Sequence, residues 1–300
     1  MKDNQPSATA KLIARSMLLL SQNAGHAALI PPQSAEMSGW CLEACGENPA
    51  RFCFLARQPW FRRLLYLVEQ STTPGLLLHY ILRKRQIEEA VRESLAAGAQ
   101  QVVILGAGFD SLAWLLHRQF PNAKFWELDH PATQKVKQAA LAAHGVLGHN
   151  LHFAALNLVS EHLADALVSE PMYQAGVETV FVAEGLLMYL NPERVSGVFR
   201  EAHKASAAGS RFAFTFLEPQ SNGRVGFARS SHFVDWWLRQ RGEPFRWGLG
   251  QMELAAFLDE HGWGLHQIIA PSALRRHYLT EEPPLPVVGD LIGLATWKPE

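Results

Sequence analysis

Hydrophobic spacing divides the chain into a helical first third and a longer part in which two periodicities alternate. Apolar residues three and four positions apart predict helices over residues 11–20, 38–45, 59–69 and 76–97. Beyond residue 97, short apolar runs bounded by glycine or polar residues predict strands at 102–105, 124–128, 151–156, 177–183 and 211–217. The stretches between them predict helices at 111–119, 132–144, 161–169 and 192–207.

This alternation predicts an α/β fold with a doubly wound, mainly parallel sheet. A helix at 251–261 is followed by two late apolar runs, 264–270 and 291–297, which predict an antiparallel C-terminal edge. No internal repeat interrupts the pattern. We therefore expect a single domain over 1–300, with an N-terminal helical cap at 1–97 and a core at 98–300. An irregular insertion at 218–250 interrupts that core.

Composition and charge narrow the class of partner. Hydrophobic residues make up 48% of the 300, enough for a large core, and the formal net charge is -1. A basic surplus is absent, which argues against nucleic acid as a partner. The apolar run Met17–Leu20 is too short to span a membrane, so we expect a cytoplasmic protein without membrane contact. Oligomeric state leaves no signature in this pattern.

The three cysteines, Cys41, Cys45 and Cys53, form an odd set near the N-terminus. An odd number of thiols gives no disulfide framework. The nearby His26 and His79 lack the spacing of a metal site. We expect buried or half-buried thiols, and no metal.

The strongest candidate for chemistry is the glycine turn at Gly106 and Gly108, which follows the first predicted strand. Glycine lets a backbone pass close beneath a ligand. In a parallel sheet, ligands bind at the carboxyl ends of the strands. The other predicted strands end in polar residues there, namely Glu127 and Asp129, Asn157, and Glu184 with Gly185. Four such strand ends predict a nucleotide site.

A carboxylate about twenty residues past the glycines is placed to bind both ribose hydroxyls. Asp129 is our choice, with Glu127 as the second candidate. The alternative is that Asp129 caps the helix that opens at Pro131. Ser111 stands where a dinucleotide fingerprint needs its third glycine, and Asp110 would repel a pyrophosphate. S-adenosylmethionine carries cationic groups and no phosphate, so this turn favours S-adenosylmethionine over NAD.

Five motifs in order resemble those of the leucine carboxyl methyltransferase family, which includes bacterial carboxyl methyltransferases acting on polyketides. They run from residue 76 to about 265, and residues 1–75 match poorly. The motifs are residues 80–83 (YILR), 105–110 (LGAGFD), 127–131 (ELDHP), 183–190 (AEGLLMYL) and 241–248 (RGEPFRWG). The resemblance implies a class I, Rossmann-like methyltransferase that uses S-adenosyl-L-methionine.

By position, the resemblance implies contacts to each part of this cofactor. Arg83 would meet the methionine carboxylate, Gly106 and Gly108 the methionine and ribose, Asp129 the ribose, Asn157 and Leu158 the adenine, and Glu184 the methionine moiety. The family usually has aspartate where this chain has Asn157, whose amide can still accept a hydrogen bond. The family's N-terminal lysine has no clear counterpart. Arg85 and a merely solvated face remain alternatives to a role for Arg83.

The acceptor side is less defined. Tyr189, Arg224, Arg229 and His232 are candidates to contact the methyl acceptor, although 230–241 also reads as an ordinary helix. A carboxylate acceptor is ionised at pH 7 and needs no general base, which fits the absence of a catalytic dyad. A hydroxyl acceptor would need one, and His130 or His232 could serve. We expect transfer to a small organic acid or natural product. A hydroxyl or a protein C-terminal carboxylate, and a non-catalytic module that binds S-adenosylmethionine, are the alternatives.

Overall fold

A computed structural model describes residues 5–23, 25–227, 230–281 and 285–299. Within these residues the strands form one seven-stranded sheet in the order β3-β2-β1-β4-β5-β7-β6. Their bounds are β1 Gln101–Leu105, β2 Lys124–Asp129, β3 Leu151–Ala155, β4 Thr179–Ala183, β5 Arg211–Phe216, β6 Trp263–Ile269 and β7 Leu291–Trp297. Strands β1 to β5 are parallel, and β7 runs antiparallel to both β5 and β6. The doubly wound sheet and its antiparallel edge are therefore confirmed.

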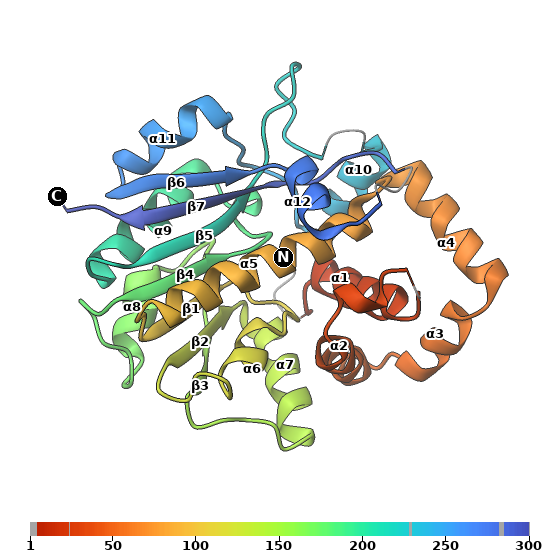
Figure 1. The fold of residues 1–300 in the computed structure, drawn as a ribbon, viewed down its shortest axis with the longest axis horizontal. Coiled ribbons are helices and arrows are strands. Elements are labelled where there is room, and N and C mark those ends of the chain that lie inside the picture. Colours follow the sequence, from red (N-terminus) through yellow and green to blue (C-terminus); the bar gives the residue numbers. More distant parts are fainter. Residues whose placement is uncertain (1–4, 24, 228–229, 282–284, 300) are drawn as a thin grey trace.

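Helices cover both faces of this sheet (Figure 1). Strand β1 shows why, because its side chains alternate: Val102 and Ile104 belong to one hydrophobic cluster, and Val103 and Leu105 to another. The first cluster takes in α5 (Leu76–Ala96), α6 (Leu112–Leu116), α7 (Pro131–Ala143) and α12 (Pro271–Tyr278). The second takes in α8 (Leu163–Ser169), α9 (Pro192–Ala205) and α11 (Gln251–Asp259). Parallel strands buried on both faces explain the continuous apolar runs.

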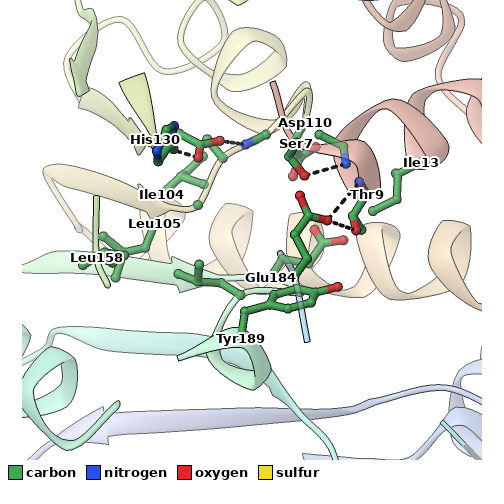
Figure 2. A pocket seen from close by; sticks show the side chains of 18 of the residues that line it. Ser7, Thr9, Ile13, Ile104, Leu105, Asp110, His130, Leu158, Glu184 and Tyr189 are labelled. Atoms are coloured by element: carbon green, nitrogen blue, oxygen red, sulfur yellow. Dashed lines mark hydrogen bonds between the residues drawn. The ribbon is translucent and has the colours of Figure 1, made fainter. Parts of the chain in front are cut away.

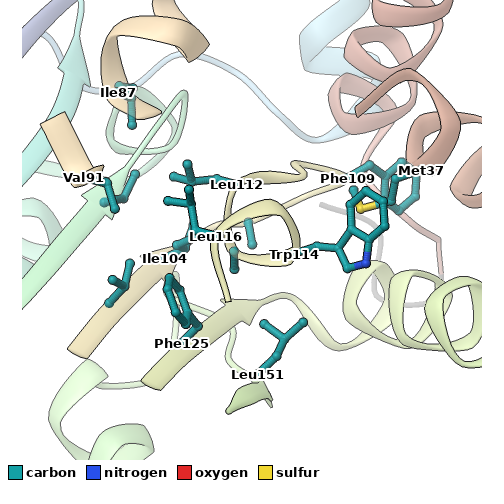
Figure 3. Close-up of a cluster of buried hydrophobic side chains, with 14 of the residues drawn as sticks. Met37, Ile87, Val91, Ile104, Phe109, Leu112, Trp114, Leu116, Phe125 and Leu151 are labelled. Carbon is teal, nitrogen blue, oxygen red and sulfur yellow. The ribbon is translucent and has the colours of Figure 1, made fainter. Parts of the chain in front are cut away.

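The N-terminal helices lie beside the carboxyl ends of the parallel strands (Figure 1). They are α1 (Ala8–Ser21), α2 (Pro32–Ala44), α3 (Pro49–Ala56) and α4 (Pro59–Thr72). Helix α2 packs on α7, and Figure 3 shows Met37 of α2 against Phe109 and Trp114 of the core. Helices α1 and α2 of the cap thus share a hydrophobic core with the sheet.

Three helices were predicted incompletely or not at all. The helix predicted at 38–45 begins six residues earlier, at Pro32, and helices α3 and α12 were not predicted. Each of these helices has proline at its first turn, where the missing N–H would lack a partner anyway. Proline therefore marks their starts and not their interruption.

The described part of the insertion at 218–250 contains helix α10 (His232–Arg241), so the ordinary-helix alternative for this stretch is confirmed. The three cysteines are free thiols, Cys41 buried and the other two half-buried. Burial raises the pKa of Cys41 to about 12. No helix in the described part of the chain is long and apolar enough to cross a membrane.

Candidate functional site

A cavity of about 210 Å³ opens where the strand order reverses, at the carboxyl ends of β1 to β4 (Figure 2). Most residues selected from the sequence line it together. They are Arg83, Gly106, Gly108, Asp129, Asn157, Leu158, Glu184 and Tyr189. The strand-end argument therefore located one continuous cavity.

The glycine turn forms the floor of this cavity. Gly106 and Gly108 have φ of +63° and +50°, a left-handed conformation that disfavours residues with a Cβ. A Cβ on Gly106 would also lie 2.7 Å from the Cδ1 atom of Leu186. The turn is anchored because the Gly106 N–H donates to the carbonyl of Leu128, 2.8 Å away on β2. The backbone is therefore exposed to a ligand without an intervening side chain.

Asp129 ends β2 at the rim of the cavity. Its carboxylate accepts hydrogen bonds from the N–H of Gly108 at 2.5 Å and of His130 at 2.6 Å. Burial raises the pKa of Asp129 to about 6, against the opposing effect of these two hydrogen bonds. The residue at the N-cap of α7 is His130, whose ring accepts from the Ala132 N–H, so Asp129 does not fill that position.

Glu127 does not line the cavity, so the structure argues against the second candidate for the ribose. Its carboxylate is buried and pairs with Lys137 Nζ at 2.5 Å. Burial raises the pKa of Glu127 to about 7, although the lysine opposes the shift. The ammonium of Lys137 also donates to the carbonyl of Asp110, so the pair supports the glycine turn from behind.

A cluster of alternating charges lies at the end of the cavity nearest β4. Glu184 accepts from Arg83 through Nε at 2.9 Å and Nη2 at 2.7 Å, and it pairs with Lys84 Nζ at 3.1 Å. Lys84 also lies 3.2 Å from Asp110. Burial alone would lower the pKa of Lys84, but the two carboxylates together raise it. The cluster therefore presents both signs of charge to a ligand.

Arg83 is held from behind by a second carboxylate. Its Nη1 atom donates to Asp290 Oδ2 at 2.8 Å, and Asp290 Oδ1 lies 2.6 Å from Nε2 of His79. Although Asp290 is fully buried, Arg83 and His79 hold its pKa well below the ordinary range. Arg85 instead contacts the carbonyl of Leu29 and does not line this cavity. The structure thus favours Arg83 over Arg85.

Asn157 follows β3 at the edge of the cavity. Its side-chain oxygen accepts from the backbone N–H of Val159 at 3.1 Å, and its backbone N–H donates to the Glu161 carboxylate at 2.6 Å. These bonds close the turn that places Leu158 in the cavity wall.

The acceptor-side candidates have different locations. Tyr189 lines this cavity and also a neighbouring one, and burial raises its pKa well above the ordinary range. Arg224 lines neither of these two cavities, and its guanidinium pairs with the Asp235 carboxylate at 2.7 Å. Arg229 and the side chain of His232 lie outside the described residues. Of the two candidates whose side chains the structure describes, Tyr189 lines the cavity and Arg224 does not.

Sequence reasoning missed several residues that form the remaining wall. Glu243 accepts from the N–H of Ala8 at 3.2 Å and from the N–H and hydroxyl of Thr9 at 3.3 and 2.5 Å. Lys84 and Arg246 also line the cavity. Glu243 and Arg246 both fall in the late motif at 241–248, which was the available signal, but nothing in it reveals contact with the N-terminus.

The strand order, the glycine turn after β1 and the acidic residue ending β2 together define the Rossmann-like fold of class I methyltransferases. A solved structure titled as a provisional methyltransferase, from Thermobifida fusca YX, shares this fold. Its TM-score is 0.57 at 16% identity, covering 90% of this chain and 98% of that one.

Family comparisons are more specific than the fold. The model of the leucine carboxyl methyltransferase family matches residues 54–203, half of the chain. The chain therefore belongs to this family, as its motifs indicated.

Relatives from bacteria carry provisional names as S-adenosyl-L-methionine-dependent methyltransferases. One from Saccharopolyspora erythraea is 31% identical over 62% of this chain and 63% of its own length. Another, YktD of Bacillus subtilis, is 26% identical over 68% of this chain and 65% of its own. The chain thus spans less than two thirds of the length of these curated relatives.

Proposed function

We propose that this protein is an S-adenosyl-L-methionine-dependent carboxyl O-methyltransferase acting on a small organic acid. The observation that carries the proposal is the shared cavity of the glycine turn, Asp129 and the charge cluster around Glu184. Family membership supports the same activity. In this proposal, residues 1–97 form a cap over the acceptor side of the 98–300 core.

The charge pattern of the cavity suits the methionine end of this cofactor. A free amino acid end carries an ammonium and a carboxylate. Glu184 would bind the ammonium, and Arg83 with Lys84 would bind the carboxylate. Because Asp290 already fixes the Arg83 guanidinium, little side-chain entropy would be lost on binding.

The other end of the cavity suits a nucleoside. Asp129 would accept hydrogen bonds from the ribose hydroxyls, each contributing about 1.5–3 kcal/mol because the acceptor is charged. Gly106 and Gly108 would let the ligand approach the backbone closely. Asn157 and Leu158 would contact the adenine.

When bound, the cofactor supplies an electrophilic methyl group on its sulfonium. An ionised carboxylate is itself the nucleophile, so the residues need not remove a proton. Their task is to align the acceptor oxygen with the methyl group and to exclude water. Such alignment can contribute about 7–11 kcal/mol to lowering the barrier.

Calorimetric titration tests the cofactor. We expect S-adenosylmethionine to bind with one-to-one stoichiometry and NAD to give no heat. Asp129→Asn should weaken S-adenosylmethionine binding at least tenfold, whereas Asp165→Asn, the same change on an exposed part of α8, should leave it unchanged. Binding of NAD without S-adenosylmethionine would refute the proposal.

Methyl transfer tests the acceptor. Protein incubated with methyl-labelled cofactor and a panel of acids should give product whose label is released by mild base, as a methyl ester requires. Label that survives base would indicate a hydroxyl acceptor instead. Cofactor binding without transfer to any acid would favour a non-catalytic binding module.

A further inference from the structure

A second cavity, which we call the apolar chamber, has a volume of about 410 Å³. It lies beside the cavity at the carboxyl ends of the strands, where we propose that the cofactor binds. Its walls come from α1, α4, α5, α10 and the segments around Phe227 and Phe245. The volume falls in the range of about 300–1,000 Å³ that is typical of small-molecule sites. Figure 1 shows α4 and α10 lying next to each other at the edge of the cap.

The chamber adjoins the proposed reaction site. Thr9 and Tyr189 line both cavities, so these two side chains form the partition between them. Figure 2 shows both residues on the side of the cavity that holds Glu184. A molecule whose body filled the chamber would therefore place its end group at the partition, facing the charged cluster and the cofactor.

The lining of the chamber is mostly aromatic and aliphatic, and its two charged members already have partners. Arg15 pairs with Glu47 at 2.7 Å, and Glu69 accepts from the Leu77 N–H at 3.2 Å. Arg15 is therefore already paired with a carboxylate, and Glu69, itself an acid, would not bind a second carboxylate of a ligand. The chamber offers hydrophobic contact, while a peptide would bring backbone amides that need hydrogen-bond partners.

Helix α4 shows that the chamber is incompletely filled. None of its 14 residues is buried, although Leu65 and Val68 on this helix line the chamber. An amphipathic helix gains stability by covering its apolar face. A ligand in the chamber would cover Leu65 and Val68, the apolar residues of this helix that line it.

Resting on the proposed function, we propose that the acceptor is a lipophilic carboxylic acid whose hydrocarbon body occupies the apolar chamber. Its carboxylate lies at the partition formed by Thr9 and Tyr189. A short acid lacks the body to fill the chamber. This assigns the substrate class by size and polarity, and it makes the chamber residues determinants of specificity.

Straight-chain acids of increasing length provide the test. Butanoate, octanoate and dodecanoate are titrated by calorimetry into protein saturated with S-adenosylhomocysteine. Each methylene buried in the chamber should strengthen binding by about fourfold until the chamber is full. Equal affinity for butanoate and dodecanoate would overturn the proposal.

A matched pair of variants locates the binding. Val234→Asp places a carboxylate in the chamber wall on α10 and should weaken dodecanoate binding at least tenfold. Val168→Asp makes the same change on α8, where the side chain is 84% exposed, and should have no effect. A second chamber variant, Leu12→Trp, should reduce the length of chain that binds. Equal dodecanoate affinity in the two aspartate variants would contradict the assignment.

Titration of S-adenosylmethionine into the same variants separates this inference from the function. If the cofactor binds to the wild type and to every variant, but dodecanoate does not bind even to the wild type or to the Val168→Asp control, the chamber assignment fails and the proposed function stands. If long acids bind and no methyl ester forms, the chamber assignment stands and the function fails. A dimer in sedimentation, with no binding of long acids, would show that a second copy covers α4.

Discussion

At the scale of single residues, the site depends on carboxylates whose surroundings shift their pKa in opposite directions. Asp129 is half-buried at the rim of the cavity and accepts hydrogen bonds from two backbone N–H groups, and its removal from water raises its pKa to about 6. Asp290 is fully buried but contacts Arg83, which keeps its pKa below the ordinary range. Two carboxylates in one region therefore respond differently to pH, because one has a cationic partner and the other has none within hydrogen-bond reach.

Cofactor affinity should depend on pH through Asp129. In the proposed function its ionised form would accept hydrogen bonds from both ribose hydroxyls, and ionisation is lost as pH falls through about 6. Between pH 7.5 and pH 5, S-adenosylmethionine affinity should be constant above pH 6 and then fall by up to about tenfold per unit. Asp129→Asn should show weaker and flat affinity over this range. A wild-type profile without an inflection would contradict the role of Asp129.

Asp290→Asn should destabilise the fold and loosen Arg83. Removing one member of a buried ion pair costs about 3–5 kcal/mol. Since the pKa of Asp290 is lowered by folding, its contribution is full above the unfolded value of about 4 and is lost as pH falls below it. In urea unfolding, the difference from wild type should therefore be largest at neutral pH and shrink in acid.

The control for Asp290 is Asp259→Asn, which removes an exposed pair with Lys298. Such surface pairs contribute less than about 1 kcal/mol, so unfolding should change little. Equal effects of the two changes would mean that Asp290 has no special role.

At the scale of elements, the N-terminal turn of α1 connects the cap to the site. The carboxylate of Glu243 receives donors from Ala8 and Thr9, and a carboxylate is favourable at a helix N-terminus. The Ser7 N–H donates to the Thr133 hydroxyl of α7 at 3.0 Å. Residues far apart in the sequence thus close one side of the cavity at the strand ends.

Glu243→Gln should release this turn. The substitution replaces the charged acceptor of the Ala8 and Thr9 hydrogen bonds by a neutral amide. Hydrogen bonds to a charged acceptor contribute about 1.5–3 kcal/mol each, so these bonds should weaken. Amide hydrogen exchange over residues 8–14 should quicken at least tenfold, while exchange in β1 stays unchanged. Glu260→Gln, at an exposed residue following α11, is the matched control. Unchanged exchange in the first turn of α1 would show that other contacts hold it.

At the scale of the whole molecule, the sheet is completed by inserting β7 between β5 and β6. In the register of β5 and β7, Gly293 lies opposite Phe214. A Cβ on Gly293 would lie only 2.4 Å from the Cζ atom of that phenylalanine. Close approach at this point lets the aromatic side chains of the second cluster pack beneath the sheet.

Gly293→Ala should therefore lower the free energy of unfolding by about 1–3 kcal/mol through overpacking. Gly39→Ala makes the same change within α2, where the new Cβ would have an ordinary 3.8 Å contact with Pro49. That control should be neutral or stabilising by up to about 1 kcal/mol, because alanine favours helices. Urea unfolding measures both. An unaffected Gly293→Ala variant would show that Phe214 moves aside at little cost.

The pattern of apolar and polar residues was sufficient to predict the sheet and one edge of the site. Each strand was a continuous apolar run ending in glycine or a polar residue, and parallel strands present those ends at the same edge. Gly106, Asp129, Asn157 and Glu184 were therefore predicted to lie together, and all four line one cavity. The start of α2 and the whole of α3 and α12 were missed, although each of these helices has proline in its first turn.

What only the tertiary structure decided are the partners of those residues. Arg83 and Asp290 are 207 positions apart, and Thr9 and Glu243 are 234 apart. No periodicity or motif encodes such pairs, because they arise where separate elements pack together. The orientation of Glu127 toward Lys137, and the chamber between α1, α4 and α10, depend on the same packing. The chain's own pattern thus determined the place of the site, and the packing of distant elements determined its charges and shape.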